Sequence, residues 1–267
     1  MVHSTACIVY STADIASFNI AGAVKEMMDF EEAEPAGGYR RLVSGHVDMI
    51  EIGTGLIEAD FIDKLVKTDL VVFLSRHSSS KNVASFTTHA LGNWSDSAEF
   101  GGRPKSLGMA SPVNMMVVLR EMNEANTTGI PVTYEATHHG PLLDTPSLFV
   151  EIGGGSDTVG DTRLAGTVAK SVVAMISKER QECEKVVIGI GGTHYPEKFT
   201  KLALGSGYAF AHIMPRYNIN VDMLQKAVER SDSNVESAVM EWKSIKAEDR
   251  DRIIRQLEGL GLDYERV

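Results

Sequence analysis

The stretch Val-Val-Ile-Gly-Ile-Gly-Gly-Thr-His-Tyr, residues 186–195, decides the fold class, because a short apolar run leads into two adjacent glycines and a histidine. A run bounded in this way predicts a buried strand. Glycines at its carboxyl end let the backbone approach a ligand closely, without interference from side chains. We therefore expect His194 to lie at the mouth of a sheet.

Further apolar runs in remote parts of the chain end in histidine in the same way. In open α/β sheets, ligands bind outside the carboxyl ends of the strands. Strands that carry histidine at this end therefore predict one convergent site. The runs and their histidines are Leu70–Leu74 with His77, Pro131–Ala136 with His138 and His139, and Tyr208–Ile213 with His212.

The composition is that of an ordinary globular protein, and 267 residues suffice for one large α/β domain with or without a small appendage. No apolar run reaches membrane-spanning length, and the first residues lack the basic start and apolar segment of a secretory signal. We expect a cytoplasmic protein without a membrane partner. The two cysteines, Cys7 and Cys183, cannot build a disulfide framework or a cysteine-type zinc site.

The formal net charge of −10 argues against general affinity for nucleic acid, since such affinity depends on neutralisation of phosphates by Lys and Arg. Residues 75–119 and 194–216 are the least acidic segments, and they also carry candidate site residues. A local basic patch is one interpretation of these segments, and a solvated face explains the same residues equally well.

Alternating strand and helix patterns predict an α/β fold with a mixed sheet for residues 1–217. The clearest helix is Thr162–Gln181, whose apolar residues share one face. Residues 75–115 show little periodicity, so they are expected to form a binding loop, a lid or an unrecognised element. Residues 218–267 are charged and helical in pattern, and we expect them to form a small helical C-terminal appendage. The helical segments expected there are 221–230, 235–246 and 249–257.

The standard catalytic signatures are largely missing. The sequence has no His-Glu-x-x-His zinc helix, no Gly-x-Ser-x-Gly elbow and no phosphate-binding loop, and the glycines before His194 do not complete a dinucleotide fingerprint. What remains is a set of histidines with carboxylates. Neutral imidazole is the commonest metal ligand and also a ready general base near neutral pH. A single histidine is more often structural, but two at one strand end, His138 and His139, have little packing reason to occur together.

Together these motifs resemble the archaeal and plant type of D-aminoacyl-tRNA deacylase, over about residues 6–217. The resemblance implies hydrolysis of the ester that joins a D-amino acid to the terminal ribose of tRNA. It also implies a three-layer fold of the phosphorylase/hydrolase-like type, an extra C-terminal subdomain and dependence on zinc. The matching motifs are Ser75-Arg-His77, Ser85-Phe-Thr-Thr-His89 with Gly92-Asn93, Thr137-His-His-Gly-Pro141, Glu151-Ile-Gly153, Gly189-Ile-Gly-Gly-Thr-His-Tyr-Pro196 and Ala209-Phe-Ala-His-Ile213.

Ester hydrolysis needs an activated water and donors for the developing oxyanion, and we place both on these motifs. Either a histidine-bound zinc ion activates the water, or a histidine such as His139 acts as base, oriented by Glu135 or Glu151. The backbone amides of Gly191 and Gly192 are the expected oxyanion donors. The predicted catalytic residues are His139, His194, Glu135 and Glu151, and the predicted zinc ligands are His77, His89, His138 and His212.

The expected partner is the acceptor end of D-aminoacyl-tRNA, bound by a monomer or a weak homodimer. Basic side chains are expected to hold the acceptor stem. The predicted substrate-binding residues are Arg76, Lys81, Gly191, Gly192, Thr193, Arg103, Lys105 and Lys198. Two alternatives stay open: a zinc-dependent peptidase or amidohydrolase on a related fold, and a non-catalytic RNA-binding module.

Overall fold

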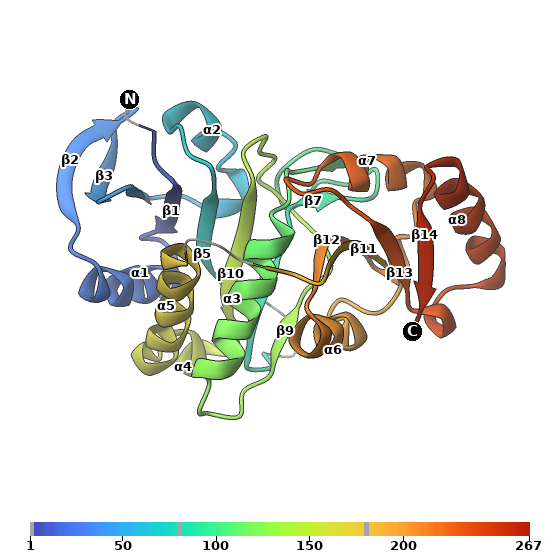
Figure 1. The fold of residues 1–267 in the computed structure, drawn as a ribbon. Helices are drawn as coiled ribbons and strands as arrows, with labels where there is room; N and C mark the ends of the chain where they lie inside the picture. The colour runs from blue at the N-terminus through green and yellow to red at the C-terminus, as the bar shows by residue number, and fades with distance from the viewer. Residues whose placement is uncertain (1–2, 79–81, 179–181) are drawn as a thin grey trace.

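The computed structural model describes residues 3–78, 82–178 and 182–267. Within these residues, the strands of the large sheet are β1 (Ala6–Ser11), β2 (Glu31–Ala36), β3 (Tyr39–Ser44), β4 (Val47–Ile52), β5 (Val71–His77), β6 (Ser85–His89), β9 (Val132–Tyr134) and β10 (Ser147–Gly153). They form a mixed eight-stranded sheet in the order β2-β3-β4-β1-β5-β10-β6-β9 (Figure 1). The predicted α/β fold with a mixed sheet is confirmed.

Helices cover one face of this sheet. The longer helices α1 (Ile15–Met27), α3 (Pro112–Ala125) and α5 (Thr162–Ser177) lie side by side against it (Figure 1). In β5, Val72 and Leu74 point into the core beneath these helices, whereas Phe73 belongs to a smaller core on the opposite face. Side chains alternate along a strand, so each buried strand supplies both cores. The short helices η1 (Leu56–Glu58) and α2 (Ile62–Leu65) cover that opposite face.

A second, parallel sheet of four strands in the described chain has the order β12-β11-β13-β14. A segment after β9 joins it to the large sheet, because the amide of Ala136 donates to the carbonyl of His194 and the amide of Thr137 donates to that of Ile213. The strands are β11 (Lys185–Ile190), β12 (Tyr208–Met214), β13 (Ser237–Met240) and β14 (Asp263–Arg266). The remaining helices are α4 (Ser156–Val159), α6 (Glu197–Ser206), η2 (Arg216–Asn218), η3 (Val221–Met223), α7 (Leu224–Glu229), η4 (Trp242–Ser244) and α8 (Ala247–Gly259).

Two expectations about secondary structure need correction. Residues 235–246 were expected to be helical, but they contain strand β13, which pairs with β11, and the short helix η4. With β14 next to β13, the C-terminal residues complete the second sheet and are not an all-helical appendage. Of the alternatives given for the segment 75–115, the unrecognised element is confirmed, since the segment contains β6 and the small pair β7 (Gly92–Asn93) and β8 (Ser106–Leu107).

Among the described residues, no helix combines the length and the apolar character needed to cross a membrane.

Candidate metal and catalytic site

The candidate site lies on the sheet face opposite α1, α3 and α5. Strand β10 places Phe149 opposite Phe73 of β5 and opposite His89 of β6. The ring of Phe149 stacks on both neighbours, with centroid distances of 4.8 Å to Phe73 and 5.2 Å to His89. Because side chains alternate, Glu151, two residues further along β10, projects from the same face. An apolar floor therefore leads into a polar cluster near the carboxyl ends of β5 and β10.

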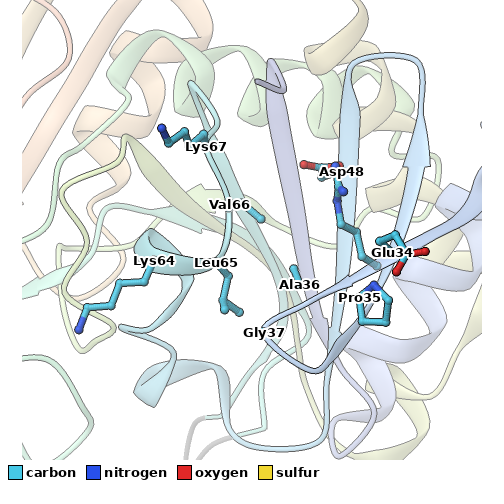
Figure 2. Close-up of a pocket in the computed structure, with 10 residues that line it drawn as sticks. Glu34, Pro35, Ala36, Gly37, Asp48, Lys64, Leu65, Val66 and Lys67 are labelled. Atoms are coloured by element: carbon cyan, nitrogen blue, oxygen red, sulfur yellow. The ribbon is translucent and has the colours of Figure 1, made fainter. Parts of the chain in front are cut away.

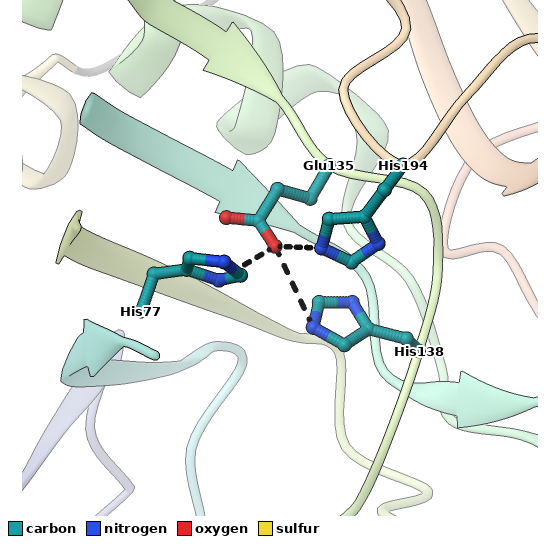
Figure 3. A group of neighbouring side chains, drawn as sticks. All are labelled: His77, Glu135, His138 and His194. Atoms are coloured by element: carbon teal, nitrogen blue, oxygen red, sulfur yellow. Dashed lines mark hydrogen bonds and ion pairs between the residues drawn. The ribbon is translucent and has the colours of Figure 1, made fainter. Parts of the chain in front are cut away.

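Glu135 is the centre of this cluster. It follows β9 directly, is buried, and its Oε2 atom lies 2.8 Å from Nε2 of His194. The same oxygen lies 3.0 Å from Nδ1 of His77, at the end of β5, and 3.5 Å from Nε2 of His138 (Figure 3). Three imidazoles from remote parts of the chain thus surround one carboxylate oxygen.

Two tyrosines extend this arrangement outward, and the sequence analysis assigned neither of them. The hydroxyl of Tyr195 lies 2.8 Å from Nε2 of His77, and the hydroxyl of Tyr217 lies 3.2 Å from Nδ1 of His194. Groups that hydrogen-bond the outer nitrogen of a histidine fix its tautomer and ring orientation. A signal existed for Tyr195, which directly follows His194, but none marked Tyr217, which comes from η2.

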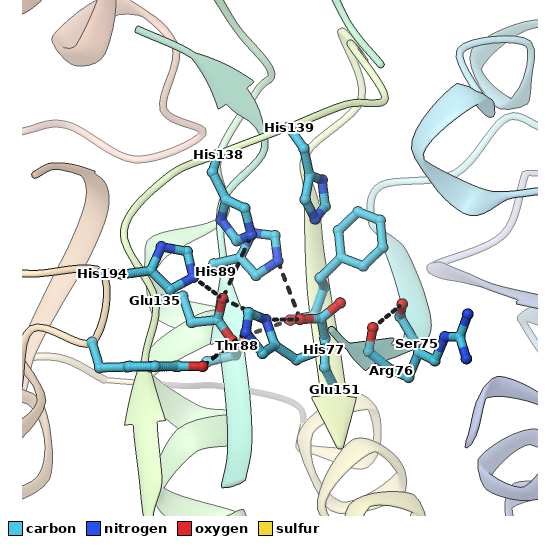
Figure 4. A network of polar contacts seen from close by, with 12 residues as sticks. Ser75, Arg76, His77, Thr88, His89, Glu135, His138, His139, Glu151 and His194 are labelled. Carbon is cyan, nitrogen blue, oxygen red and sulfur yellow. Dashed lines mark hydrogen bonds and ion pairs between the residues drawn. The ribbon is translucent and has the colours of Figure 1, made fainter. Parts of the chain in front are cut away.

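The second part of the cluster is a set of three imidazoles, His89, His138 and His139 (Figure 4). Each ring donates its Nδ1 proton to a backbone carbonyl: His89 to Ala90 at 3.0 Å, His138 to Ala136 at 2.8 Å and His139 to Gly140 at 2.6 Å. This leaves Nε2 of each ring to act as a ligand. One ring nitrogen from each of the three histidines lies within 4.8 Å of the other two. We call His89, His138 and His139 the three-imidazole set.

His139 adopts a backbone conformation that is unusual for a side chain with a Cβ atom. Its φ angle is +45°, in the left-handed region that favours glycine. Backbone strain of this kind persists only where the surrounding structure holds it, and it is concentrated at functional sites. With this backbone conformation, the ring centroids of His139 and His138 lie 4.2 Å apart.

Several buried polar atoms of the cluster have no hydrogen-bond partner among the described residues. They are Oε1 of Glu135 and the pair Nε2 of His89 and Oε2 of Glu151, which lie 3.6 Å apart, too far for a hydrogen bond. Burial of an unpaired polar group costs about 1–3 kcal/mol, so such atoms require an explanation. A divalent cation explains them, since histidine nitrogens and carboxylate oxygens are the ligands that zinc takes in proteins. The residues present therefore fit a metal ion, as the resemblance predicted.

The cluster also perturbs the protonation of its members. Burial lowers the pKa of His77, but the carboxylates of Glu135 and Glu151, 3.0 Å and 3.5 Å from its Nδ1, outweigh this and raise it to about 10. Burial lowers the pKa of His139 to about 4, so this imidazole is neutral near pH 7. Burial alone would raise the pKa of Glu135, but hydrogen bonds from His194 and His77 hold it well below its usual range. Strong shifts of this kind are typical of functional sites.

His212 does not belong to the cluster, which corrects its prediction as a zinc ligand. The ring is buried in β12, and both of its nitrogens are engaged by the protein. The hydroxyl of Thr137 lies 3.2 Å from Nδ1, and Nε2 donates to the carbonyl of Arg230 at 2.9 Å. A histidine with both nitrogens satisfied has no lone pair left for a metal, so His212 is a structural residue.

The amides of Gly191 and Gly192 are not available as oxyanion donors. The amide of Gly191 donates to the carbonyl of Met214, and that of Gly192 donates to Oγ of Ser244 at 2.8 Å. Both φ angles are positive, +100° and +76°, so glycine is required here by the turn. The two glycines shape the loop that carries His194, and this corrects their predicted role.

A cavity of about 660 Å³ opens onto the cluster. His77, His138, His139 and His194 line one side, and Leu56, Ile57 and Phe100 form an apolar side. Arg76, which was predicted to contact the substrate, also lines the cavity. A smaller cavity, about 400 Å³, lies between strands β2 to β4 and helix α2, near Asp48 and Lys67, and shares no lining residue with the larger one (Figure 2).

The other predicted substrate contacts lie at or near the surface. Arg103 and Thr193 are exposed, Lys198 is half-buried in α6, and Nζ of Lys105 lies 2.8 Å from Oδ1 of Asp96. Lys81 lies outside the described residues. These side chains are not part of the cluster, so any role they have is in holding a larger substrate.

Comparisons with known proteins agree on one family. A sequence profile for D-aminoacyl-tRNA deacylase matches residues 65–265. The D-aminoacyl-tRNA deacylase of Thermococcus kodakarensis is 36% identical over 269 residues, which cover 97% of this chain and 98% of that protein. The one of Ignicoccus hospitalis is 42% identical over 199 residues, covering 73% of this chain and 80% of that protein. A solved structure of a conserved protein of unknown function is 30% identical and superposes with a TM-score of 0.91, covering 98% of this chain and 95% of the other.

Proposed function

The chain belongs to the D-aminoacyl-tRNA deacylase family, and from this premise we propose that it hydrolyses D-aminoacyl-tRNA at the cluster around Glu135. The family profile and the full-length relatives confirm the resemblance drawn from the motifs, and they make the protein a hydrolase. The proposed position of the active site is supported by one observation: buried carboxylates and imidazoles come together next to one cavity.

We propose that the three-imidazole set holds a zinc ion. Three histidines with an open position are a common zinc site in hydrolases, and the carbonyl partners of the Nδ1 atoms fix the rings for binding through Nε2. A zinc ion bound there would supply a Lewis acid for the ester carbonyl. The orphaned nitrogen of His89 supports an ion at this position.

We assign the proton transfer to His194, with Glu135 holding its ring. The carboxylate accepts the Nε2 proton at 2.8 Å, which directs Nδ1 outward to the Tyr217 hydroxyl at 3.2 Å. A water bound to that hydroxyl would pass its proton through the hydroxyl to Nδ1 as the water oxygen attacks the ester carbon. The same proton then goes to the ribose oxygen when the carbon–oxygen bond breaks, which releases free amino acid and tRNA.

His77, Glu135 and His194 also share a ligand-like arrangement with His138. If this second set binds its own ion, His194 is a ligand and not the base. Metal content separates the two roles: zinc that is fully retained in His194→Ala leaves His194 free for proton transfer, and zinc that is lost in this variant makes His194 a ligand. Zinc analysis of the purified protein, with and without His194→Ala, decides between them.

The nucleotide end of the substrate lies toward the exposed basic side chains in this proposal. Arg76 lines the cavity, and Arg103 is exposed close to Phe100 in sequence, so both are placed to contact phosphates near the acceptor end. Lys105 and Lys198 lie further out and would contact the stem. A protein that acts on aminoacyl-tRNA is expected in the cytoplasm.

The test of this function compares the two stereoisomers of one substrate. Incubation with D-Tyr-tRNA and L-Tyr-tRNA should release only D-tyrosine. Release from neither substrate, with cleavage of a peptide or amide by the zinc-loaded protein, would instead support the peptidase or amidohydrolase alternative.

A further inference from the structure

Phe100 is an aromatic side chain at the mouth of the cavity above the cluster. It is 66% exposed, yet it lines the same cavity as His138, His139 and His194. Single exposed apolar residues are common on protein surfaces and need no explanation by themselves. An exposed phenyl ring that lines the same cavity as the histidine cluster is different, because it offers an aromatic surface to a substrate bound in that cavity.

The backbone that carries Phe100 is held firmly in place. The amide of Gly140, next to His139, donates to the carbonyl of Phe100 at 2.9 Å. The side-chain amide of Asn93 donates to the carbonyl of Gly101 at 2.9 Å. Gly101 has a φ of +77°, and a Cβ atom there would lie only 1.9 Å from the carbonyl oxygen of Ile57. The loop is thus packed against its neighbours, and the ring is presented to solvent by a fixed backbone.

If the proposed function holds, the chemistry of the substrate determines which of its ends faces the opening of the cavity. The ester joins an amino acid, which ends there, to a nucleotide that continues into a large RNA. The nucleotide must therefore lie toward the opening of the cavity, and the amino acid toward its interior. Leu56, which is buried, and Ile57, which is half-buried, supply apolar surface further in for an amino-acid side chain.

We propose that Phe100 is a stacking surface for the base of the 3′-terminal adenosine of D-aminoacyl-tRNA, and so a substrate-positioning residue. The end of the acceptor strand is unpaired, and proteins recognise unpaired bases by stacking them on aromatic side chains. Phe100 is 66% exposed while lining the cavity, so most of its ring surface is available to a flat base. Stacking there orients the terminal ribose, and with it the ester, toward His194 and the three-imidazole set.

The first test measures kcat/KM of the zinc-loaded enzyme on D-Tyr-tRNA and D-Ala-tRNA. Loss of one base–aromatic stack is expected to reduce kcat/KM about tenfold or more in Phe100→Ala, equally for both amino acids. Phe100→Trp should restore activity, because indole also stacks. The matched control is Phe18→Ala, which removes another exposed phenylalanine, 47% exposed on α1 and outside this cavity, and it should leave kcat/KM within twofold.

The second test uses inhibitors of D-Tyr-tRNA hydrolysis that differ only in the base. AMP should inhibit the parent enzyme at least about tenfold more strongly than ribose 5-phosphate, and this difference should disappear in Phe100→Ala. Equal inhibition of the parent by the two compounds would overturn the proposal. So would a loss in Phe100→Ala that appears with D-Tyr-tRNA and not with D-Ala-tRNA, since the ring would then contact the amino acid. Failure of the proposed function is distinct, because the parent enzyme would then hydrolyse neither D-aminoacyl-tRNA.

Discussion

Glu135 and His194 are 59 residues apart in the sequence, and the carboxylate of one lies 2.8 Å from Nε2 of the other. The backbones are joined as well, because the amide of Ala136, next to Glu135, donates to the carbonyl of His194 at 2.8 Å. The carboxylate–imidazole pair is therefore fixed both through its side chains and through the link between the two sheets. A pair held in this way needs little rearrangement during the reaction.

The first prediction concerns the charge of Glu135. Glu135→Gln keeps the size of the side chain but removes the charge that orients His77 and His194. Deacylation of D-Tyr-tRNA should fall at least about 100-fold, the usual scale for loss of oriented acid–base catalysis. Glu197→Gln, at an exposed position on α6, serves as the control and should match the parent. More than a tenth of the parent rate in Glu135→Gln would contradict the central role of this carboxylate.

The second prediction tests which histidines bind zinc and which are structural. His139→Ala removes one of the three fixed Nε2 ligands, so the purified protein should bind zinc at least about tenfold more weakly in competition with a chelator. His212→Ala should leave zinc affinity unchanged, because both of its nitrogens are engaged by Thr137 and Arg230. Loss of zinc from His212→Ala while the fold is retained would show that the assignment is wrong.

Sequence reasoning located most of the cluster because strand ends are visible in the sequence. Continuous apolar runs marked β5, β10 and β11, and His77 and His194 follow two of them. Topology then brings these ends to one place. The prediction was wrong for His212, since an apolar run that contains a histidine does not reveal whether the ring faces a site or a neighbouring carbonyl.

Other features were hidden because tertiary contacts override local pattern. Strand β6, Ser-Phe-Thr-Thr-His, is polar in sequence and was included in a long loop, yet it lies between β10 and β9. Its Thr88 hydroxyl donates to the carbonyl of Phe149 at 2.7 Å, a long-range contact that no local pattern contains. Strand β13 likewise depends on pairing with β11. The glycine amides at 191 and 192 have partners in β12 and η4 regions that are remote in sequence.

A third prediction concerns the outer partner of His194. Tyr217→Phe removes the hydroxyl that lies 3.2 Å from Nδ1 and leaves the ring in place. Loss of such an outer hydrogen bond usually lowers activity or metal affinity 10- to 100-fold, so we expect about tenfold slower deacylation with an unchanged melting temperature. Tyr264→Phe, on β14 at the edge of the second sheet, is the control. Full activity in Tyr217→Phe would mean that Glu135 alone orients His194.

Metal removal should destabilise the protein. Without an ion, the buried carboxylates of Glu135 and Glu151 depend on the neighbouring histidines alone for compensation. A ligand at 1,000 times its Kd stabilises the folded state by about 4 kcal/mol, and each kcal/mol shifts the melting temperature of a chain of this size by about 2–4 °C. Calorimetry before and after treatment with a chelator should therefore show a drop of several degrees that added zinc reverses. An unchanged melting temperature would place the metal, if any, outside this cluster.

The last prediction concerns pH and rests on His212. Burial lowers the pKa of this imidazole to about 4, from an ordinary value of 6.5. In the unfolded chain the ring binds a proton below pH 6.5, whereas in the folded chain it does so only below about pH 4. Its contribution to stability is therefore fully present above pH 6.5, is lost as the pH falls from 6.5 to 4, and amounts to about 3 kcal/mol. Urea unfolding at a series of pH values should show this loss in the parent protein and a smaller one in His212→Gln, whose amide can still donate to the carbonyl of Arg230. His46→Gln, which removes an exposed histidine, provides the comparison. If His212→Gln loses as much stability as the parent between pH 6.5 and 4, the acid sensitivity arises from other groups and the buried, neutral state of His212 is disproved.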